Sequence, residues 1–198
     1  MSAALKKVTL DEYFAIEERA ERKSEYHNGD MFLMAGASRE HNILARNLSL
    51  ELQSRMRNSA CQVFFTDMRV RVQRTGLYTY PDLLIVGGTP EYATENRDTL
   101  VNPKVVIEIL SDSTERYDRT TKFRHYKQLP SVQEYVLVSQ AEPLVERFTR
   151  QDDGAWGQVD FVGLETEMVI ASVPLSVPMA DVFRGVEFPE RAEPLPGV

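Results

Sequence analysis

The sequence predicts an α/β fold with a mixed sheet flanked by helices, and three observations support this. Segments with apolar residues at helical spacing alternate along the chain with short runs rich in Val, Ile and Leu. Turn-forming residues separate these segments, for example at residues 27–30 and 75–76. The chain has 198 residues, 42% of them hydrophobic, enough to bury a sizeable core. We therefore expect one domain over residues 1–198, with its core in residues 10–185.

In the first half of the chain, the sequence predicts two helices and an antiparallel hairpin. Thr9 is a candidate N-cap for the first helix, and Glu12, three residues later, completes a capping box. Leu44, Leu48 and Leu52 recur at helical spacing and indicate a longer second helix. The predicted elements are a helix over 9–22, a strand over 31–34, a helix over 41–57, and strands over 62–73 and 77–86 that pair through a turn.

The second half predicts further strands around one more helix. A strand over 105–110 is followed by four consecutive residues, Ser111 to Thr114, that can cap a helix ending near Pro130. The remaining predicted elements are strands over 132–138, 143–149 and 156–162, a short helix over 179–183, and a frayed tail over 190–198.

Two carboxylates lie within apolar runs that read as buried strands. Asp82 stands in Tyr-Pro-Asp-Leu-Leu-Ile-Val, and Glu108 stands in Val-Val-Ile-Glu-Ile-Leu. Burying a carboxylate is unfavourable unless a cation or hydrogen-bond donors compensate its charge. A divalent metal ion is the obvious partner for the two residues.

Composition and charge exclude several classes of protein. No run approaches the roughly 18 apolar residues of a membrane-spanning helix, and the first residues lack the apolar centre of a signal peptide, so we expect a cytoplasmic protein. Cys61 is the only cysteine, which excludes an internal disulfide and a zinc site built on several thiolates. The formal net charge of −7 argues against a protein that coats nucleic acid through bulk charge.

The order and spacing of the polar motifs resemble those of one known family. The motifs are, in chain order, Ser-Glu25-Tyr before a turn, His41 at the start of the long helix, Tyr-Pro-Asp82-Leu-Leu-Ile-Val, Val-Val-Ile-Glu108-Ile-Leu-Ser, Asp118-Arg-Thr-Thr-Lys122-Phe-Arg-His-Tyr126-Lys and Pro-Ser-Val-Gln-Glu-Tyr-Val-Leu-Val. Over residues 10–185 this combination resembles the Uma2 family of restriction-endonuclease-like proteins, a branch of the PD-(D/E)XK nuclease superfamily. The resemblance implies a restriction-endonuclease-like core with an N-terminal helix, a long second helix and a C-terminal β extension.

The resemblance also implies a magnesium site, in which Mn²⁺ can substitute. Its ligands would be the carboxylates of Asp82 and Glu108 and the carbonyl of Ile109, because Mg²⁺ prefers hard oxygen ligands. The superfamily pattern has a lysine two residues after the glutamate, where this chain has Leu110. By the family pattern, Lys122 in the following helix takes over that role.

The same resemblance implies roles for the residues around this site. Lys122 would orient or deprotonate the attacking water, or stabilise developing negative charge as a cation. Glu25 would act with these catalytic residues, as a further ligand or by holding a water. His41 or Tyr126 would steady the phosphate or support neighbouring side chains.

The two strand carboxylates also have purely structural interpretations. Asp82 could start a strand and accept hydrogen bonds from nearby backbone amides. Glu108 has apolar neighbours, so a structural role requires a buried cationic partner such as Arg69 or Arg71.

Structural interpretations exist for the other candidates as well. Lys122 could form a solvent-exposed ion pair with Asp118, four residues earlier on the same helix. Glu25 could be one more acid of an acidic N-terminal helix. His41 could simply occupy the first turn of its helix.

These observations leave three functional hypotheses. The first is a magnesium-dependent endonuclease that hydrolyses phosphodiester bonds in DNA. The second is a binding or interaction module that keeps the nuclease fold with little or no catalysis, which the acidic net charge and the displaced lysine favour. The third is a metal-dependent hydrolase of another phosphate ester. Superfamily nucleases often pair to reach both DNA strands, so a homodimer is considered too, formed through exposed strand edges such as residues 143–149.

Overall fold

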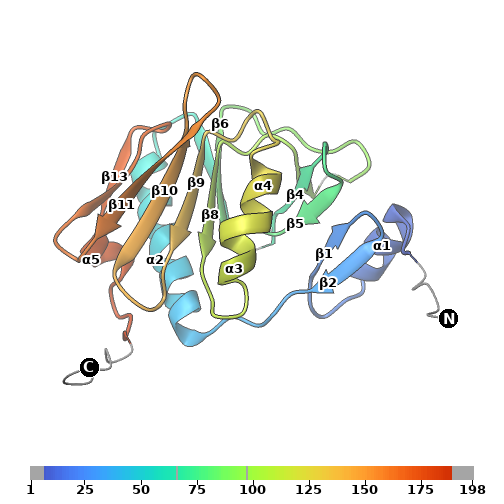
Figure 1. The fold of residues 1–198 in the computed structure, drawn as a ribbon, viewed down its shortest axis with the longest axis horizontal. Coiled ribbons are helices and arrows are strands. Elements are labelled where there is room, and N and C mark those ends of the chain that lie inside the picture. Colours follow the sequence, from blue (N-terminus) through green and yellow to red (C-terminus); the bar gives the residue numbers. More distant parts are fainter. Residues whose placement is uncertain (1–6, 66, 97, 189–198) are drawn as a thin grey trace, which may run out of the picture.

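The largest sheet of the molecule has six strands and is mixed, as the computed structural model shows (Figure 1). The structure describes residues 7–65, 67–96 and 98–188. The strand order is β11-β10-β9-β8-β6-β3, in which β8 and β9 are parallel and the other neighbours are antiparallel. The strands are β3 Cys61–Phe65, β6 Leu83–Gly87, β8 Val105–Ile109, β9 Glu134–Val138, β10 Leu144–Arg150 and β11 Trp156–Val162.

A second sheet of five strands lies beside the first, and a two-stranded sheet lies at the opposite side of the molecule (Figure 1). The five-stranded sheet has the order β2-β1-β5-β4-β7. Its strands are β1 Ser24–His27, β2 Asp30–Leu33, β4 Arg69–Val72, β5 Leu77–Thr79 and β7 Thr99–Leu100. The two-stranded sheet pairs β12 Glu167–Ile170 with β13 Leu175–Pro178.

The first two helices begin where the sequence provides caps, whereas Thr114 before the third helix makes no side-chain capping bond. Helix α1 (Leu10–Glu17) has the predicted capping box between Thr9 and Glu12. Helix α2 (Arg39–Met56) starts after Ser38, whose side chain accepts a hydrogen bond from the backbone N–H of His41. The predicted helix after β8 is a composite of α3 (Glu115–Tyr117), the π-helical segment η1 (Asp118–Lys122) and α4 (Phe123–Tyr126). Helix α5 (Met179–Val182) is the predicted short helix near the end of the core.

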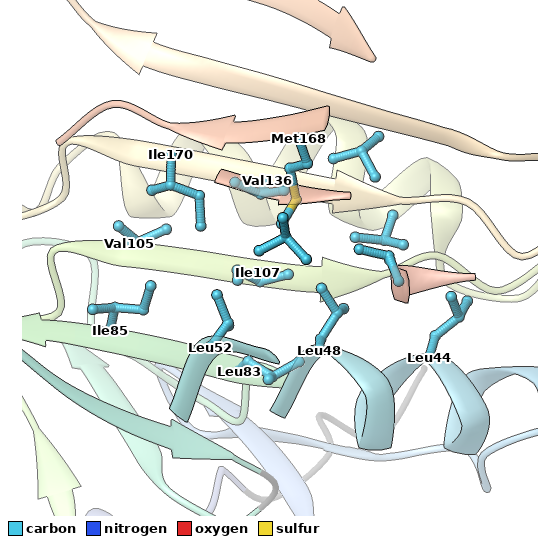
Figure 2. Packing of buried hydrophobic residues seen from close by; sticks show 14 of the residues in the cluster. Leu44, Leu48, Leu52, Leu83, Ile85, Val105, Ile107, Val136, Met168 and Ile170 are labelled. Atoms are coloured by element: carbon cyan, nitrogen blue, oxygen red, sulfur yellow. The ribbon is translucent and has the colours of Figure 1, made fainter. Parts of the chain in front are cut away.

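Residues of β8 alternate between two hydrophobic clusters that cover opposite faces of the six-stranded sheet. One cluster joins the leucines of α2 to Ile107 of β8 and to Leu83 and Ile85 of β6 (Figure 2). Ile109 belongs to the same cluster. The other contains Val106 and Leu110 and packs under the composite helix and the five-stranded sheet. Because side chains of a strand alternate between its faces, Glu108 points to the second cluster, toward the composite helix.

The prediction of one continuous hairpin over residues 62–86 is wrong. The chain forms an outer pair, β3 with β6, and an inner pair, β4 with β5, and the two pairs belong to different sheets. The pairing registers of the two differ by one residue, so the ladder does not continue from one pair to the other. The segment from Tyr80 to Asp82 crosses from the smaller sheet to the larger one.

Other differences from the prediction concern edges and short strands. Strand β10, which covers the segment proposed as a dimer edge, lies between β9 and β11 and is not an edge. The strands β1, β7, β12 and β13 were not predicted. The predicted tail over residues 190–198 lies outside the described residues. Within the described ranges, no helix combines the length and apolar character needed to cross a bilayer.

Candidate active site

Lys122 lies at the centre of a buried cluster of carboxylates. Its Nζ atom is 2.9 Å from Oε1 of Glu108, 3.5 Å from Oε1 of Glu25 and 3.5 Å from Oδ1 of Asp118. The four side chains are between 4% and 9% exposed. The cluster joins β8, β1 and η1, three elements that are distant in the sequence. We call these four residues the acid–lysine cluster.

The composite helix is fixed over the sheet by tyrosine hydroxyl groups. Tyr126 donates a hydrogen bond to Oε1 of Glu108 at 3.0 Å, and Tyr135 of β9 donates to the backbone carbonyl of Asp118 at 3.1 Å. The ring of Tyr135 also stacks on Phe123, with centroids 4.8 Å apart. These contacts hold both ends of η1, so the position of Lys122 is set by packing on the sheet.

Glu25 lies in the buried strand β1 and not in the N-terminal helix, so its interpretation as a helix acid is wrong. Thr79 of β5 donates a hydrogen bond to Oε1 of Glu25, and Tyr117 donates to Oε2 at 3.0 Å. Since β1 pairs with β5, the five-stranded sheet delivers both Glu25 and its threonine partner to the cluster.

Asp82 lies directly before β6 and faces the end of β8. Its Oδ2 atom accepts a hydrogen bond from the backbone N–H of Ile109 at 2.7 Å, so an amide of the neighbouring strand is one of its partners. In the antiparallel register Leu83 pairs with Ile107, and the next step places Asp82 opposite Glu108. The second oxygen, Oδ1, lies 3.1 Å from Nε2 of His41.

The site is most open at Asp82 and His41. Their side chains are 22% and 18% exposed, whereas those of the acid–lysine cluster are at most 9% exposed. His41 therefore does more than occupy the first turn of α2, because it contacts a predicted site residue at the accessible side. A ligand from solvent would reach Asp82 before it reaches Lys122.

Burial and charge together change the acid–base properties of the cluster. Burial, with the neighbouring charges of Asp118 and Asp82, raises the pKa of Glu108 well above its ordinary value, although Lys122 opposes this. The pKa of Asp118 is raised as well, and burial is its main cause. Burial lowers the pKa of Lys122, but Glu108, Glu25 and Asp118 outweigh it and raise that pKa well above its ordinary value. The lysine is thus a stable cation in an environment with an excess of acids.

The structure identifies the ion-pair partners of Glu108 and Lys122. The cationic partner of Glu108 is Lys122, whereas Arg69 binds Tyr80 and Arg71 binds Glu95. Lys122 does contact Asp118 at helical spacing, but this pair is buried and not solvent-exposed.

Three further residues of the site were not predicted. The sequence indicates Asp118 only as an ion-pair partner, although its position four residues before Lys122 places it on the same helix face. Tyr117 and Thr79, which bind Glu25, carry no recognisable sequence signal. Their roles depend on how the five-stranded sheet packs on the composite helix.

The donor set at Asp82 and Glu108 suits a hard divalent cation. Among the residues that the structure describes, no three acidic, histidine or cysteine side chains are grouped so as to hold a metal ion alone. Mg²⁺ needs fewer, since it typically uses one or two carboxylates and keeps several waters. Each carboxylate oxygen has two lone pairs, so Asp82 can still offer one on each oxygen. The excess of buried acids over the single lysine also favours an added cation.

Comparison with known proteins places the fold and the family. The model of the Uma2 family, described as "Putative restriction endonuclease", matches residues 10–180. Two uncharacterised proteins of Synechocystis sp. (strain ATCC 27184 / PCC 6803 / Kazusa) are similar along nearly their whole lengths. The protein sll1609 is 32% identical over 166 residues, which cover 84% of this chain and 94% of the relative. The protein slr1290 is 30% identical over 187 residues, which cover 94% and 97%.

A solved structure shows the same fold. The crystal structure of a "putative nuclease" from Anabaena variabilis ATCC 29413 superposes with a TM-score of 0.72 at 19% sequence identity, covering 89% of this chain and 97% of that one. The restriction-endonuclease-like fold is therefore confirmed, and fold and family together support a nuclease function in general. With a family model that matches most of its length, this chain belongs to the Uma2 family.

Proposed function

We propose that this protein is a Mg²⁺-dependent endonuclease that hydrolyses phosphodiester bonds in DNA. The observation that carries the proposal is the meeting of Asp82, Glu108 and a buried, charged lysine at one end of the large sheet. This combination is the one that the PD-(D/E)XK pattern requires, with Lys122 in place of the residue at Leu110. A purely structural site would not need three buried acids around one cation.

In this proposal Asp82 and Glu108 hold the metal ion, with the carbonyl of Ile109 as a third protein ligand. A bound Mg²⁺ would supply Lewis-acid stabilisation of the charge that develops on the scissile phosphate. The Ile109 N–H and His41 keep the carboxylate of Asp82 in a fixed orientation. Tyr126 does the same for Glu108 through its hydroxyl group.

Lys122 acts as a cation in this proposal. Its pKa is raised by three acids, so it keeps its proton and is a poor general base. A fixed ammonium group in a buried site can stabilise negative charge on the reacting phosphate. Glu25 and Asp118 hold Lys122 in place, and Glu25 is in turn fixed by Thr79 and Tyr117.

Cleavage of supercoiled plasmid DNA tests the proposal directly. We expect nicking and linearisation with Mg²⁺ or Mn²⁺ and none with EDTA. Asp82→Asn, which preserves shape and removes charge, should abolish cleavage, whereas Asp160→Asn on the exposed face of β11 should not. Undiminished cleavage by Asp82→Asn, or cleavage in EDTA, would exclude the proposed metal site. Parallel assays with RNA and with nucleotides separate DNA cleavage from hydrolysis of another phosphate ester.

A second candidate function is a nuclease-fold binding module without catalysis. The contact that favours it is the 2.9 Å ion pair between Lys122 and Glu108, because here the lysine itself neutralises a proposed metal ligand. The two functions differ in metal binding. Calorimetric titration that shows no binding of Mg²⁺ or Mn²⁺ at millimolar concentration would favour the binding module.

A further inference from the structure

One glutamine side chain joins the start of α2 to the end of β8. Gln140 lies in the turn after β9, and its Nε2 atom donates a hydrogen bond to the backbone carbonyl of Leu110 at 2.5 Å. Its Oε1 atom accepts a hydrogen bond from the hydroxyl group of Ser38, also at 2.5 Å. A single amide thus bridges segments that lie 30 and 102 positions away in the sequence.

Ser38 passes this connection on to the first turn of α2. As the N-cap, its Oγ atom accepts a hydrogen bond from the N–H of His41 at 3.0 Å while its hydroxyl proton goes to Gln140. Its carbonyl accepts two further bonds from Asn42, one from the backbone and one from the side chain. Ser38 therefore holds the start of α2 through both its hydroxyl group and its backbone carbonyl.

The connections close into a ring at the accessible side of the candidate site. His41, fixed by Ser38, places Nε2 at 3.1 Å from Oδ1 of Asp82. Asp82 in turn accepts a hydrogen bond from the backbone N–H of Ile109. The next residue, Leu110, accepts a hydrogen bond from Gln140 at its backbone carbonyl. Each member of the ring contacts the next by a hydrogen bond, a close polar contact or a peptide bond.

We propose that Gln140 is a positioning residue, which sets the start of α2 against the end of β8 and so holds His41 on Asp82. The rest of α2 is anchored independently, since Leu44, Leu48 and Leu52 are fully buried in the core (Figure 2). Loss of Gln140 should therefore release the first turn without unfolding the helix. The catalytic consequence rests on the proposed function, but the contact between His41 and Asp82 does not.

The contact is tested without metal through the imidazole signals of the protein. The chain has three histidines, so their ring signals in NMR spectra can be assigned by single substitutions. We expect Gln140→Ala to shift the His41 signals in the direction produced by Asp82→Asn and to leave His27 and His125 unchanged. Gln140→Glu keeps the acceptor for Ser38 but loses the donor for Leu110, and it should shift His41 in the same direction.

A matched control lies at the other end of β9. Gln133 also donates from its side-chain amide to a backbone carbonyl, that of Pro130, at 3.2 Å. Gln133→Ala should leave the His41 signals unchanged. The two variants, Gln133→Ala and Gln140→Ala, should have the same midpoint of thermal unfolding. His41 signals that are the same in wild type, Gln140→Ala and Gln140→Glu would overturn the proposal. An equal shift in Gln133→Ala would overturn it too, because the effect would then be general.

A second measurement uses calorimetric titration with Mn²⁺. Residues that orient metal ligands typically change metal affinity by about 10- to 100-fold. We expect a loss of this size in Gln140→Ala and wild-type affinity in Gln133→Ala. Equal affinity in all three proteins would overturn the positioning role at the metal. If wild type binds no Mn²⁺, the proposed function fails, and the His41 signals still decide the role of Gln140.

Discussion

Two buried glutamates on neighbouring strands differ in how their charges are compensated. Glu134 starts β9, is fully buried and accepts hydrogen bonds from the backbone N–H groups of Ala171 and Ser172, as well as from hydroxyl groups. The Nε atom of Arg147 lies 3.4 Å from Oε1 of Glu134. Glu108, near the end of β8, is 3% exposed, and among the described residues its one hydroxyl donor is Tyr126, beside Lys122.

The two glutamates also occupy opposite ends of the sheet. Glu134 pairs in register with Val105 at the start of β8, whereas Glu108 pairs with Leu137 near the end of β9. Glu134 ties the turn between β12 and β13 to the sheet through several neutral donors, as a structural acid should. Glu108 shares one cation with Glu25 and Asp118, and its charge is incompletely compensated. This deficit distinguishes a candidate functional acid from a structural one.

The largest expected effect is the loss of activity in Glu108→Gln. In the proposed function Glu108 holds the metal ion that would stabilise charge in the transition state, so its loss should reduce plasmid cleavage by about 10³-fold. The free energy of unfolding should stay the same or rise, because burial disfavours the charged form of Glu108 and raises its pKa, while Glu25 and Asp118 still pair with Lys122. Urea denaturation followed by circular dichroism measures the second quantity. A large loss of stability would mean that Glu108 is a structural acid like Glu134.

Replacing the cation should have the largest effect on stability. Lys122→Met leaves three buried carboxylates without a positive charge and should lower the free energy of unfolding by about 3–5 kcal/mol. The control is Lys127→Met, at a lysine that lies 4.5 Å from the ring centroid of Phe123, and it should cost at most about 1 kcal/mol. Urea titrations of both variants provide the comparison. If Lys122→Met lowers the free energy of unfolding as little as Lys127→Met does, the acid–lysine cluster needs no internal cation.

A smaller and opposite pattern is expected for Glu134→Gln. In Glu134→Gln an NH2 group replaces one carboxylate oxygen and cannot accept the hydrogen bonds that this oxygen receives. The free energy of unfolding should therefore fall by about 2 kcal/mol. Cleavage per folded molecule, measured well below the thermal midpoint, should be unchanged. The exposed Glu167, which binds Ser176, offers the control Glu167→Gln with little effect on either quantity. Loss of cleavage in folded Glu134→Gln would remove the distinction between the two acids.

The smallest effect is the stabilisation by metal. At ten times its dissociation constant, Mn²⁺ should raise the free energy of unfolding of the wild type by about 1.4 kcal/mol. The same increase is expected in Glu134→Gln and none in Glu108→Gln. Thermal unfolding with and without Mn²⁺ measures it. Stabilisation of Glu108→Gln equal to that of wild type would place the metal elsewhere.

The sequence predicted those features that local patterns determine. The capping box at Thr9, the long second helix and the strand around Glu108 all follow from spacing within a few residues, and the structure has them. The candidate site was partly predictable for the same reason, because Asp82 and Glu108 stand out within apolar runs. Lys122 was assigned only through the resemblance to the family.

Features that depend on packing between distant segments could not be predicted. Periodicity gave one strand over residues 62–73, but it does not reveal that β3 and β4 join different sheets. Arg69 and Arg71 were considered as partners of Glu108 because they are cations near a strand. In the structure Arg69 donates a hydrogen bond to the hydroxyl group of Tyr80, and Arg71 forms an ion pair with Glu95. No local pattern encodes the meeting of Glu25 with Lys122.

The crossing of the chain between the two sheets has a consequence for folding kinetics. Glu25 and Thr79 belong to the five-stranded sheet, whereas Glu108 belongs to the six-stranded sheet and Asp82 directly precedes β6 of that sheet. Neither sheet alone contains a complete site, and contacts between residues far apart in the sequence form slowly because of loop entropy. During refolding, the recovery of metal binding should therefore lag behind the circular dichroism signal of the strands.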